Sequence, residues 1–268
     1  MSAIATVHTD DSSKPPLVLV HGLGSAGSIW KSLLPELMND FSVYAVDLPG
    51  HGQAPLHTEI GLEPDSLARN IIEMMERDHG VTELHAAGNS LGGWIALEMA
   101  ACAPDRVKSV TALAPAGLWH EGPTQKLPPS MLARILAKIS QFFMPLAYHL
   151  PPLKAIGYKK ITHLWRELSY ESCRDSVIAM ARSKGYLPVW NGIRGRKFDS
   201  HIPESVEVAI VFGDSDLTLP KEVAQERSVA PHHSQWIVVE NCAHVIMWNF
   251  PKITVDFIRK TAKVGLAH

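Results

Sequence analysis

The chain has 268 residues, enough for one domain with an elaboration or for two small domains around a large core. Hydrophobic residues make up 46% and charged residues 19%, with a net charge of -2, so a disordered chain or a nucleic-acid-binding protein is disfavoured. The three cysteines show no metal or disulfide spacing, no apolar run is long enough for a membrane span, and the first residues lack a signal-peptide pattern, so we expect a cytoplasmic protein.

Short apolar runs alternate with helical patterns through the first half of the chain. Asp65 or Ser66 can begin the second of these helices, and Gly80 can end it. The alternation predicts an α/β fold with a mostly parallel central sheet and helices on both faces. The expected strands lie at 3–8, 17–20, 43–46, 83–87 and 107–113, and the expected helices at 29–38, 65–78 and 93–102.

The pattern changes in the middle of the chain, where prolines cluster and helical stripes replace strand-like runs. Helices are expected there at 131–143 and 176–184. Strands at 206–212 and 235–239 and helices at 221–229 and 253–263 then resume the alternation. We therefore predict a core of residues 1–117 and 201–268, with residues 118–200 forming a helical insertion between two sheet strands.

The stretch Gly88-Asn89-Ser90-Leu91-Gly92 joins an expected strand to an expected helix. A sharp turn at this point would push the Ser90 hydroxyl out above the strand ends, and small neighbours permit the close backbone approach that it needs. The first N–H groups of the helix would point at whatever binds there. The pattern favours a nucleophile elbow over the alternative, a glycine-rich turn of an ordinary α/β protein.

A serine nucleophile needs a base to take its proton and a carboxylate to orient that base. Parallel sheets place such groups at the carboxyl ends of their strands. His244 follows the last expected strand, and Asp214 and Asp216 follow the strand before it. Asp216 is the preferred acid, and Asp214 is the alternative that also has a simpler explanation as a turn-capping residue.

These pieces together resemble the α/β-hydrolase fold superfamily over nearly the whole chain. The resemblance implies that Ser90 is the nucleophile, His244 the base and Asp216 the acid, and that the backbone N–H groups of Leu23 and Leu91 bind the oxyanion. We expect no cofactor and no metal site, since His232-His233 has no partner ligand at a suitable spacing. Members that open epoxides or remove halogens have an aspartate at the elbow, so Ser90 favours acyl transfer. The matching segments are Leu19-Val20-His21-Gly22, Asp47-Leu48-Pro49-Gly50-His51-Gly52, Gly88-Asn89-Ser90-Leu91-Gly92-Gly93, Gly213-Asp214-Ser215-Asp216 and Cys242-Ala243-His244.

The insertion resembles the helical cap of this superfamily, which covers the nucleophile and sets specificity. Its apolar stripe allows three interpretations: an acyl pocket, the core of the cap itself, or an amphipathic helix on a membrane surface with Arg134 and Lys138 at its edge. The stripe consists of Leu132, Leu136, Ile139 and Phe143, and the residues proposed to line the substrate pocket are Trp119, Leu136, Phe143, Trp190 and Val245.

The leading hypothesis is a serine hydrolase that cleaves an ester of a small to medium apolar acyl group. The first alternative is a carbon–carbon bond hydrolase of the meta-cleavage type, which Gly88-Asn89-Ser90 mildly resembles, although that branch usually has tryptophan where Val245 follows His244. The second alternative is a ligand receptor on a hydrolase fold. The expected partner is a small molecule. His21 and His51 are expected to have structural roles, and Cys242 is expected to be a packed thiol.

Overall fold

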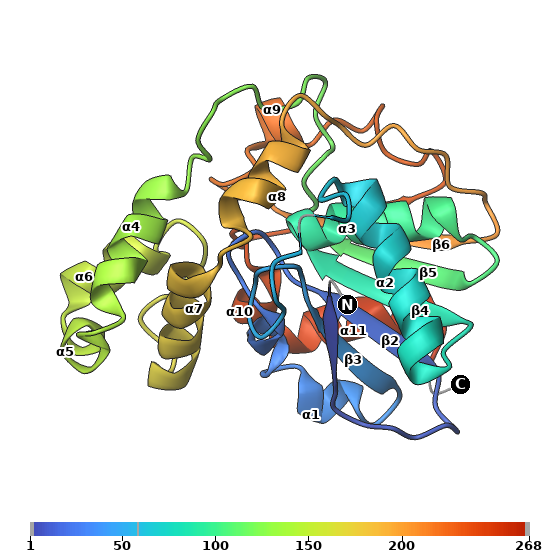
Figure 1. Ribbon diagram of the computed structural model, residues 1–268, viewed down its shortest axis with the longest axis horizontal. Coiled ribbons are helices and arrows are strands. Elements are labelled where there is room, and N and C mark those ends of the chain that lie inside the picture. The colour runs from blue at the N-terminus through green and yellow to red at the C-terminus, as the bar shows by residue number, and fades with distance from the viewer. Residues whose placement is uncertain (1–2, 58, 266–268) are drawn as a thin grey trace.

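Figure 1 shows a computed structural model of the protein, which describes residues 3–57 and 59–265. Seven strands form a sheet in the order β1-β3-β2-β4-β5-β6-β7. The first strand pairs antiparallel with β3, and the other neighbours are parallel. This confirms the predicted α/β fold with a mostly parallel sheet. The strands are β1 (Ile4–Val7), β2 (Pro16–Val20), β3 (Ser42–Asp47), β4 (Leu84–Asn89), β5 (Val107–Leu113), β6 (Glu207–Gly213) and β7 (Gln235–Val239).

Helices cover both faces of the sheet (Figure 1). Helices α2 (Pro64–His79) and α3 (Leu91–Cys102) pack together, and α3 rests on β4 and β5. Helix α11 (Pro251–Ala262) contacts β5 and β6 from the other face. Because the central strands are covered on both sides, β3 is buried at every residue, and its sequence is an almost unbroken apolar run.

Helix α2 ends as predicted, at Gly80 in the left-handed conformation with φ 67°. Its beginning differs from the prediction. The residue before the first helical position is Glu63, and no side chain caps the helix there. Pro64 takes the first position instead, where its fixed φ suits the helix and its missing N–H costs nothing.

Three expected helices are shorter than predicted, and the one expected at 131–143 is α4 (Met131–Ser140). The stretch 29–38 is a 3-10 turn, η1 (Gly27–Trp30), followed by the short helix α1 (Leu34–Leu37), because Pro35 has no N–H to continue a helix from the preceding turn. The stretch 221–229 retains only α9 (Lys221–Ala224). The N–H of Glu226 donates to the Leu118 carbonyl at 2.9 Å, which takes the chain out of the helical path.

The segment between β5 and β6 is helical, and its first four helices stand beside the sheet at the left of Figure 1. These helices share a small core of their own, formed by Met144, Tyr158, Trp165, Leu168 and Cys173. The limits 118 and 200 of the insertion stay predictions. The helices are α4 (Met131–Ser140), α5 (Met144–His149), α6 (Pro151–Tyr158), α7 (Tyr170–Arg182) and α8 (Tyr186–Ile193), and α10 (Ile246–Asn249) follows β7.

Helix α7 begins six residues before its predicted start, because the Ser169 hydroxyl accepts the Ser172 N–H at 3.1 Å and caps it. None of the helices in the described part of the chain has both the length and the apolar character needed to cross a bilayer.

Candidate active site

Ser90 lies at the turn between β4 and α3, in a backbone conformation that few non-glycine residues adopt. Its φ is 58° and its ψ is -119°, and its N–H donates to the Leu113 carbonyl of the neighbouring strand at 2.9 Å. Such a conformation costs on the order of 1–3 kcal/mol, which the surrounding structure must supply. The Ser90 side chain is half-buried at the carboxyl edge of the sheet.

The two glycines of the elbow are required by close backbone contacts. A Cβ atom at Gly88 would lie 2.0 Å from the Gly92 carbonyl oxygen, and one at Gly92 would lie 2.0 Å from the Val20 carbonyl oxygen. Helix α3 therefore begins tightly against β2 and β4. Any side chain at either position would push the Ser90 turn out of place.

The loop after β2 passes directly beside Ser90. A Cβ atom at Gly22 would lie 3.1 Å from Cβ and 3.7 Å from Oγ of Ser90. Leu23 follows in this loop, and Leu91 is the first residue of α3, where helix N–H groups have no partner within the helix. The structure thus brings the loop that carries Leu23 and the start of α3 to Ser90. That the N–H groups of Leu23 and Leu91 bind the oxyanion stays a prediction.

His21 holds this loop in place. Its Nε2 accepts the N–H of Leu48 at 3.1 Å, so its Nδ1 carries the proton and donates to the Gly22 carbonyl at 2.7 Å. Burial lowers the pKa of His21 to about 4 and that of the adjacent His51 to about 3, where the nearby His21 adds to the effect. Both histidines are buried, His21 has the structural role expected of it, and the structural role of His51 stays a prediction.

The imidazole of His244 contacts a carboxylate. Its Nδ1 donates to Oδ2 of Asp216 at 2.7 Å, and both side chains are buried. The other oxygen, Oδ1, accepts the N–H groups of Thr218 and Leu219 at 2.8 and 2.9 Å. With both carboxylate oxygens fixed, the ring is held in the tautomer that leaves Nε2 free to accept a proton.

The alternative acid, Asp214, has a different task. Its Oδ1 accepts the Ser215 hydroxyl at 2.8 Å and the Cys242 N–H at 3.2 Å. The Ser215 N–H in turn donates to the Cys242 carbonyl at 3.0 Å. Asp214 therefore joins the loop after β6 to the loop after β7, while Asp216 is the carboxylate that reaches His244.

Asn89 contributes a contact that the sequence did not reveal. Its buried amide Nδ2 donates to the carbonyls of Leu113 at 3.1 Å and His244 at 3.2 Å. The residue before Ser90 thus holds the backbone that carries His244. The asparagine next to the elbow serine is visible in the sequence. The sequence did not show which backbone carbonyls its amide would reach.

An apolar groove of about 370 Å³ lies among the helices α4 to α7. Of the predicted pocket residues, Leu136 and Phe143 line it. Its inner wall reaches the residues that flank the site: the Ile161 carbonyl accepts the Val245 N–H at 2.9 Å, and Met180 packs so closely on Gly24 that a Cβ there would lie 2.6 Å from its sulfur. Neither Ile161 nor Met180 was expected from the sequence.

The other predicted pocket residues are buried and do not line this groove. The Trp119 ring packs edge-on against Trp94, and its Nε1 donates to the Arg196 carbonyl at 2.7 Å. Trp190 is buried in the main core, where its Nε1 donates to the Gln125 carbonyl at 3.1 Å. Val245 is also buried in that core, next to His244.

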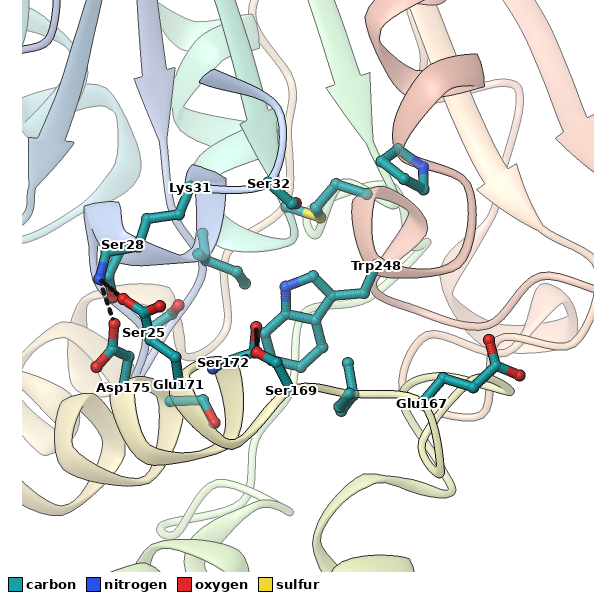
Figure 2. A pocket seen from close by; sticks show the side chains of 15 residues that line it. Ser25, Ser28, Lys31, Ser32, Glu167, Ser169, Glu171, Ser172, Asp175 and Trp248 are labelled. Atoms are coloured by element: carbon teal, nitrogen blue, oxygen red, sulfur yellow. Dashed lines mark hydrogen bonds and ion pairs between the residues drawn. The ribbon is translucent and has the colours of Figure 1, made fainter. Parts of the chain in front are cut away.

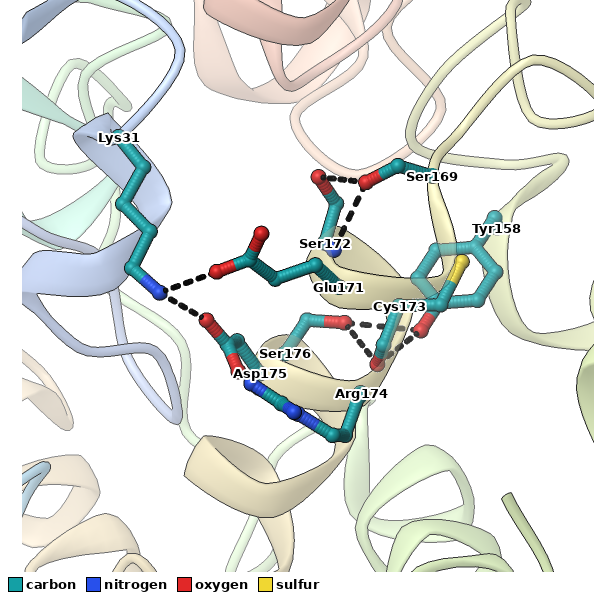
Figure 3. Close-up of polar contacts among 9 residues, drawn as sticks. All are labelled: Lys31, Tyr158, Ser169, Glu171, Ser172, Cys173, Arg174, Asp175 and Ser176. Atoms are coloured by element: carbon teal, nitrogen blue, oxygen red, sulfur yellow. Dashed lines mark hydrogen bonds and ion pairs between the residues drawn. The ribbon is translucent and has the colours of Figure 1, made fainter. Parts of the chain in front are cut away.

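A second cavity of about 380 Å³ separates α7 from the core at η1 and the start of α11 (Figure 2). Its lining is mixed and includes six serines. Lys31 bridges it, with Nζ 2.9 Å from Glu171 and 2.6 Å from Asp175, so α7 is tied to the core by charge (Figure 3). None of the predicted site residues lines this cavity. The serines are Ser25, Ser28, Ser32, Ser169, Ser172 and Ser176.

Among residues 3–57 and 59–265, no group of three or more His, Cys, Asp or Glu side chains lies close enough to hold a metal ion. Cys242 is buried and accepts a contact from the Asn249 amide at 3.3 Å, and burial raises the pKa of its thiol to about 11, as suits a packed thiol.

Comparison with known proteins agrees with this architecture. Residues 17–257 match a family described as the alpha/beta hydrolase family. A pimeloyl-[acyl-carrier protein] methyl ester esterase of Vibrio parahaemolyticus is 32% identical over 234 residues, which cover 86% of this chain and 87% of that protein. The enzyme of the same description from Aeromonas hydrophila is 25% identical over 247 residues, covering 91% and 94%.

Among solved structures, a thermophilic esterase from Thermogutta terrifontis superposes with a TM-score of 0.70 over 97% of this chain and 93% of that one, at 17% identity. At that identity the likeness concerns the fold alone. The family match covers most of the sequence, including the strands and loops that carry Ser90, Asp216 and His244. The chain belongs to the alpha/beta hydrolase family.

Proposed function

We propose that this hydrolase cleaves carboxylic esters through a covalent acyl-enzyme. The observation that carries the proposal is the 2.7 Å hydrogen bond between His244 and Asp216. It lies at the same sheet edge as the strained Ser90 turn, and the Asn89 amide links the two. Acyl transfer requires a base of fixed tautomer that can reach the serine, and these contacts support that arrangement for His244 and Ser90.

In the proposed reaction, Nε2 of His244 takes the proton from Ser90 Oγ as this oxygen attacks the ester carbonyl. The carbonyl oxygen becomes negatively charged and accepts the backbone N–H groups of Leu23 and Leu91. One such donor typically lowers the barrier by about 3 kcal/mol. The imidazolium, stabilised by Asp216, then protonates the departing alcohol, and water attacks the acyl-enzyme with His244 again as the base.

The groove among α4 to α7 supports an apolar acyl group as the part of the substrate that is recognised. Its volume of about 370 Å³ falls in the range of small-molecule sites. Two relatives are described as methyl ester esterases of an acyl group attached to a carrier protein. We propose an ester of a small alcohol with an acyl chain of medium length.

The test is turnover of p-nitrophenyl esters of increasing acyl length, with the wild-type protein and Ser90→Ala. We expect multiple turnover that rises from acetate to a medium chain, and loss of that turnover in Ser90→Ala. Ester cleavage that survives in Ser90→Ala would overturn the nucleophile assignment.

A vinylogous 1,5-diketone in the same assay separates the competing functions. Fast diketone cleavage with poor ester turnover would point to carbon–carbon bond hydrolysis instead. Binding without multiple turnover on either substrate would point to a receptor.

A further inference from the structure

The outer side of the helical insertion is unusually apolar. Of the 18 large hydrophobic side chains that are exposed in the described residues, 11 lie between residues 127 and 156. The exposed fraction reaches 76% at Phe142, 67% at Leu132 and 64% at Ile156. Large apolar side chains exposed in such number on one segment mark a site of interaction. We call these 11 residues the apolar face: Leu127, Leu132, Ile135, Leu136, Ile139, Phe142, Phe143, Leu146, Leu150, Leu153 and Ile156.

The helices that carry the apolar face extend away from the sheet (Figure 1). Its stripe does not form the core of the insertion, since Leu132, Ile139 and Phe143 are each more than half exposed. That interpretation of the stripe is wrong. The interior of the insertion is built instead from residues such as Met144 and Tyr158, which face α7.

The charge of this segment has a single sign. From Gly122 to Arg166 there are seven Lys and Arg residues and no Asp or Glu, although the whole chain has a net charge of -2. Lys138, Lys159 and Lys160 are exposed, and none of them pairs with a carboxylate among the described residues, unlike Lys31 and Lys108. These three exposed lysines carry unneutralised positive charge.

The lysines lie beside the apolar side chains. Lys138 stands three residues after Ile135 on α4, so the two share one side of the helix, and Phe142 follows in the turn after the helix. Lys159 follows Ile156 by three residues at the end of α6. An apolar surface with a lysine rim is the composition of helices that lie in the interface of an anionic bilayer.

The apolar groove opens on this face. Five members of the apolar face also line the groove, and its inner wall includes Ile161 and Met180, which contact Val245 and Gly24 beside the predicted site. The groove therefore lies between the apolar face and the residues that flank Ser90 and His244. The five shared residues are Leu136, Ile139, Phe143, Leu153 and Ile156.

We propose that the apolar face docks on an anionic lipid surface and that the groove receives the acyl chain of a lipid-borne ester from it. An acidic protein could neutralise the lysines, but its charged surface would leave the phenyl and aliphatic side chains in contact with polar groups. A bilayer accommodates both, because acyl chains cover the apolar side chains while anionic headgroups face the lysines. The docking does not depend on the proposed ester hydrolysis, whereas the uptake of a lipid-borne ester as substrate rests on it.

Docking is tested by co-sedimentation of the Ser90→Ala protein with unilamellar vesicles, so that no product forms. We expect binding to phosphatidylcholine vesicles that contain phosphatidylglycerol, and at least about tenfold weaker binding to phosphatidylcholine alone. Raising the salt to about 0.5 M should weaken binding to the anionic vesicles by screening the lysines. Absence of binding to anionic vesicles, or equal binding to both kinds, would overturn the proposal.

Variants assign the binding to the face. Phe142→Glu with Leu146→Glu should weaken vesicle binding more than about tenfold, and both residues lie outside the groove lining. Lys138→Glu, Lys159→Glu and Lys160→Glu together should weaken it about 100-fold, since each lysine near a charged bilayer contributes about fivefold. The matched control is Val223→Glu with Ile253→Glu. It replaces exposed apolar residues that lie outside the apolar face and should bind as the parent does.

The same substitutions are also made in the protein that retains Ser90. Turnover of a water-soluble short ester by these variants reports on folding and should not change. Unweakened vesicle binding by the Phe142→Glu, Leu146→Glu protein would contradict the assignment to this face, as would binding to an acidic acyl carrier protein without binding to vesicles. Intact vesicle binding without any ester turnover would instead count against the proposed function alone.

Discussion

The side-chain amide of Asn89 donates to the backbone carbonyl of His244 at 3.2 Å, across a separation of 155 residues in the chain. The residue next to the proposed nucleophile therefore fixes the loop that carries the proposed base. The same amide also donates to Leu113 on the adjacent strand. Together these bonds set the position of the His244 backbone relative to the Ser90 turn.

Asn89→Ala should lower kcat by about 10- to 100-fold with little change in KM, because a small misplacement of a catalytic group slows the chemical step without weakening substrate binding. Steady-state kinetics on a medium-chain ester measure this split. Chemical unfolding of the same variant serves as the control, since the lost buried hydrogen bonds should cost only about 1–3 kcal/mol. An unchanged kcat would show that Asn89 has no positioning role.

The two aspartates after β6 should respond differently to the same small change. Asp216→Asn should lower kcat by about 10⁴-fold, because an amide no longer favours the productive tautomer and the imidazolium of His244. Asp214→Asn should affect kcat only modestly, since its contacts hold the turn between Ser215 and Cys242. Kinetics of the two variants side by side decide the matter, and a greater loss in Asp214→Asn would reverse the assignment.

Much of this site could be predicted because its parts have local causes. The elbow at Ser90 is specified by Gly88 and Gly92, which permit backbone contacts that a Cβ would prevent. The strands before His244 and Asp216 are short apolar runs between turn residues, and parallel sheets bring their ends to one edge. The choice between Asp214 and Asp216 as the acid was harder to predict, because it depends on which carboxylate the loop turns toward His244.

The stability of the protein should fall as the pH drops below the ordinary pKa of histidine. His21 has a pKa of about 4 in the folded protein, lowered by burial from 6.5, so between these values the unfolded chain binds a proton that the folded chain does not. The free energy of unfolding should therefore decrease by about 2 kcal/mol from pH 7 to pH 5 because of His21, and His51 adds in the same direction.

Urea unfolding at the two pH values measures the effect, with His21→Gln as the comparison. This variant cannot take up the proton, so its loss of stability between pH 7 and pH 5 should be smaller by about 2 kcal/mol, whatever its starting stability. Equal losses in the two proteins would mean that His21 does not titrate on unfolding in this range.

Gly157 offers a way to narrow the groove without disturbing its walls. It lines the groove on α6, and a Cβ at this position would meet nothing within 4 Å. Gly157→Trp should therefore raise KM for long-chain esters while leaving turnover of acetate esters unchanged, and Gly157→Ala should behave as the wild type. The chain-length profile of kcat/KM measures this, and an unchanged profile in the tryptophan variant would place the acyl chain elsewhere.

The groove itself could not be predicted in this way. The helical spacing of Leu136 and Phe143 showed that they share a side of a helix, but not whether that side faces the core, the groove or solvent. Trp119 and Trp190 have the size to shape a pocket, yet their indole N–H groups reach backbone carbonyls in the packed interior. Met180 and Ile161 gave no signal, because only the placement of the whole insertion brings them to Gly24 and Val245.

Covalent trapping tests most directly whether Ser90 forms a covalent bond with the acyl group. The protein is incubated with an alkyl fluorophosphonate, and the adduct is located by intact-mass measurement and peptide mapping. We predict one adduct on Ser90, none in Ser90→Ala, and much slower labelling in His244→Ala. Labelling of another residue, or turnover that continues after Ser90 is fully labelled, would contradict the account.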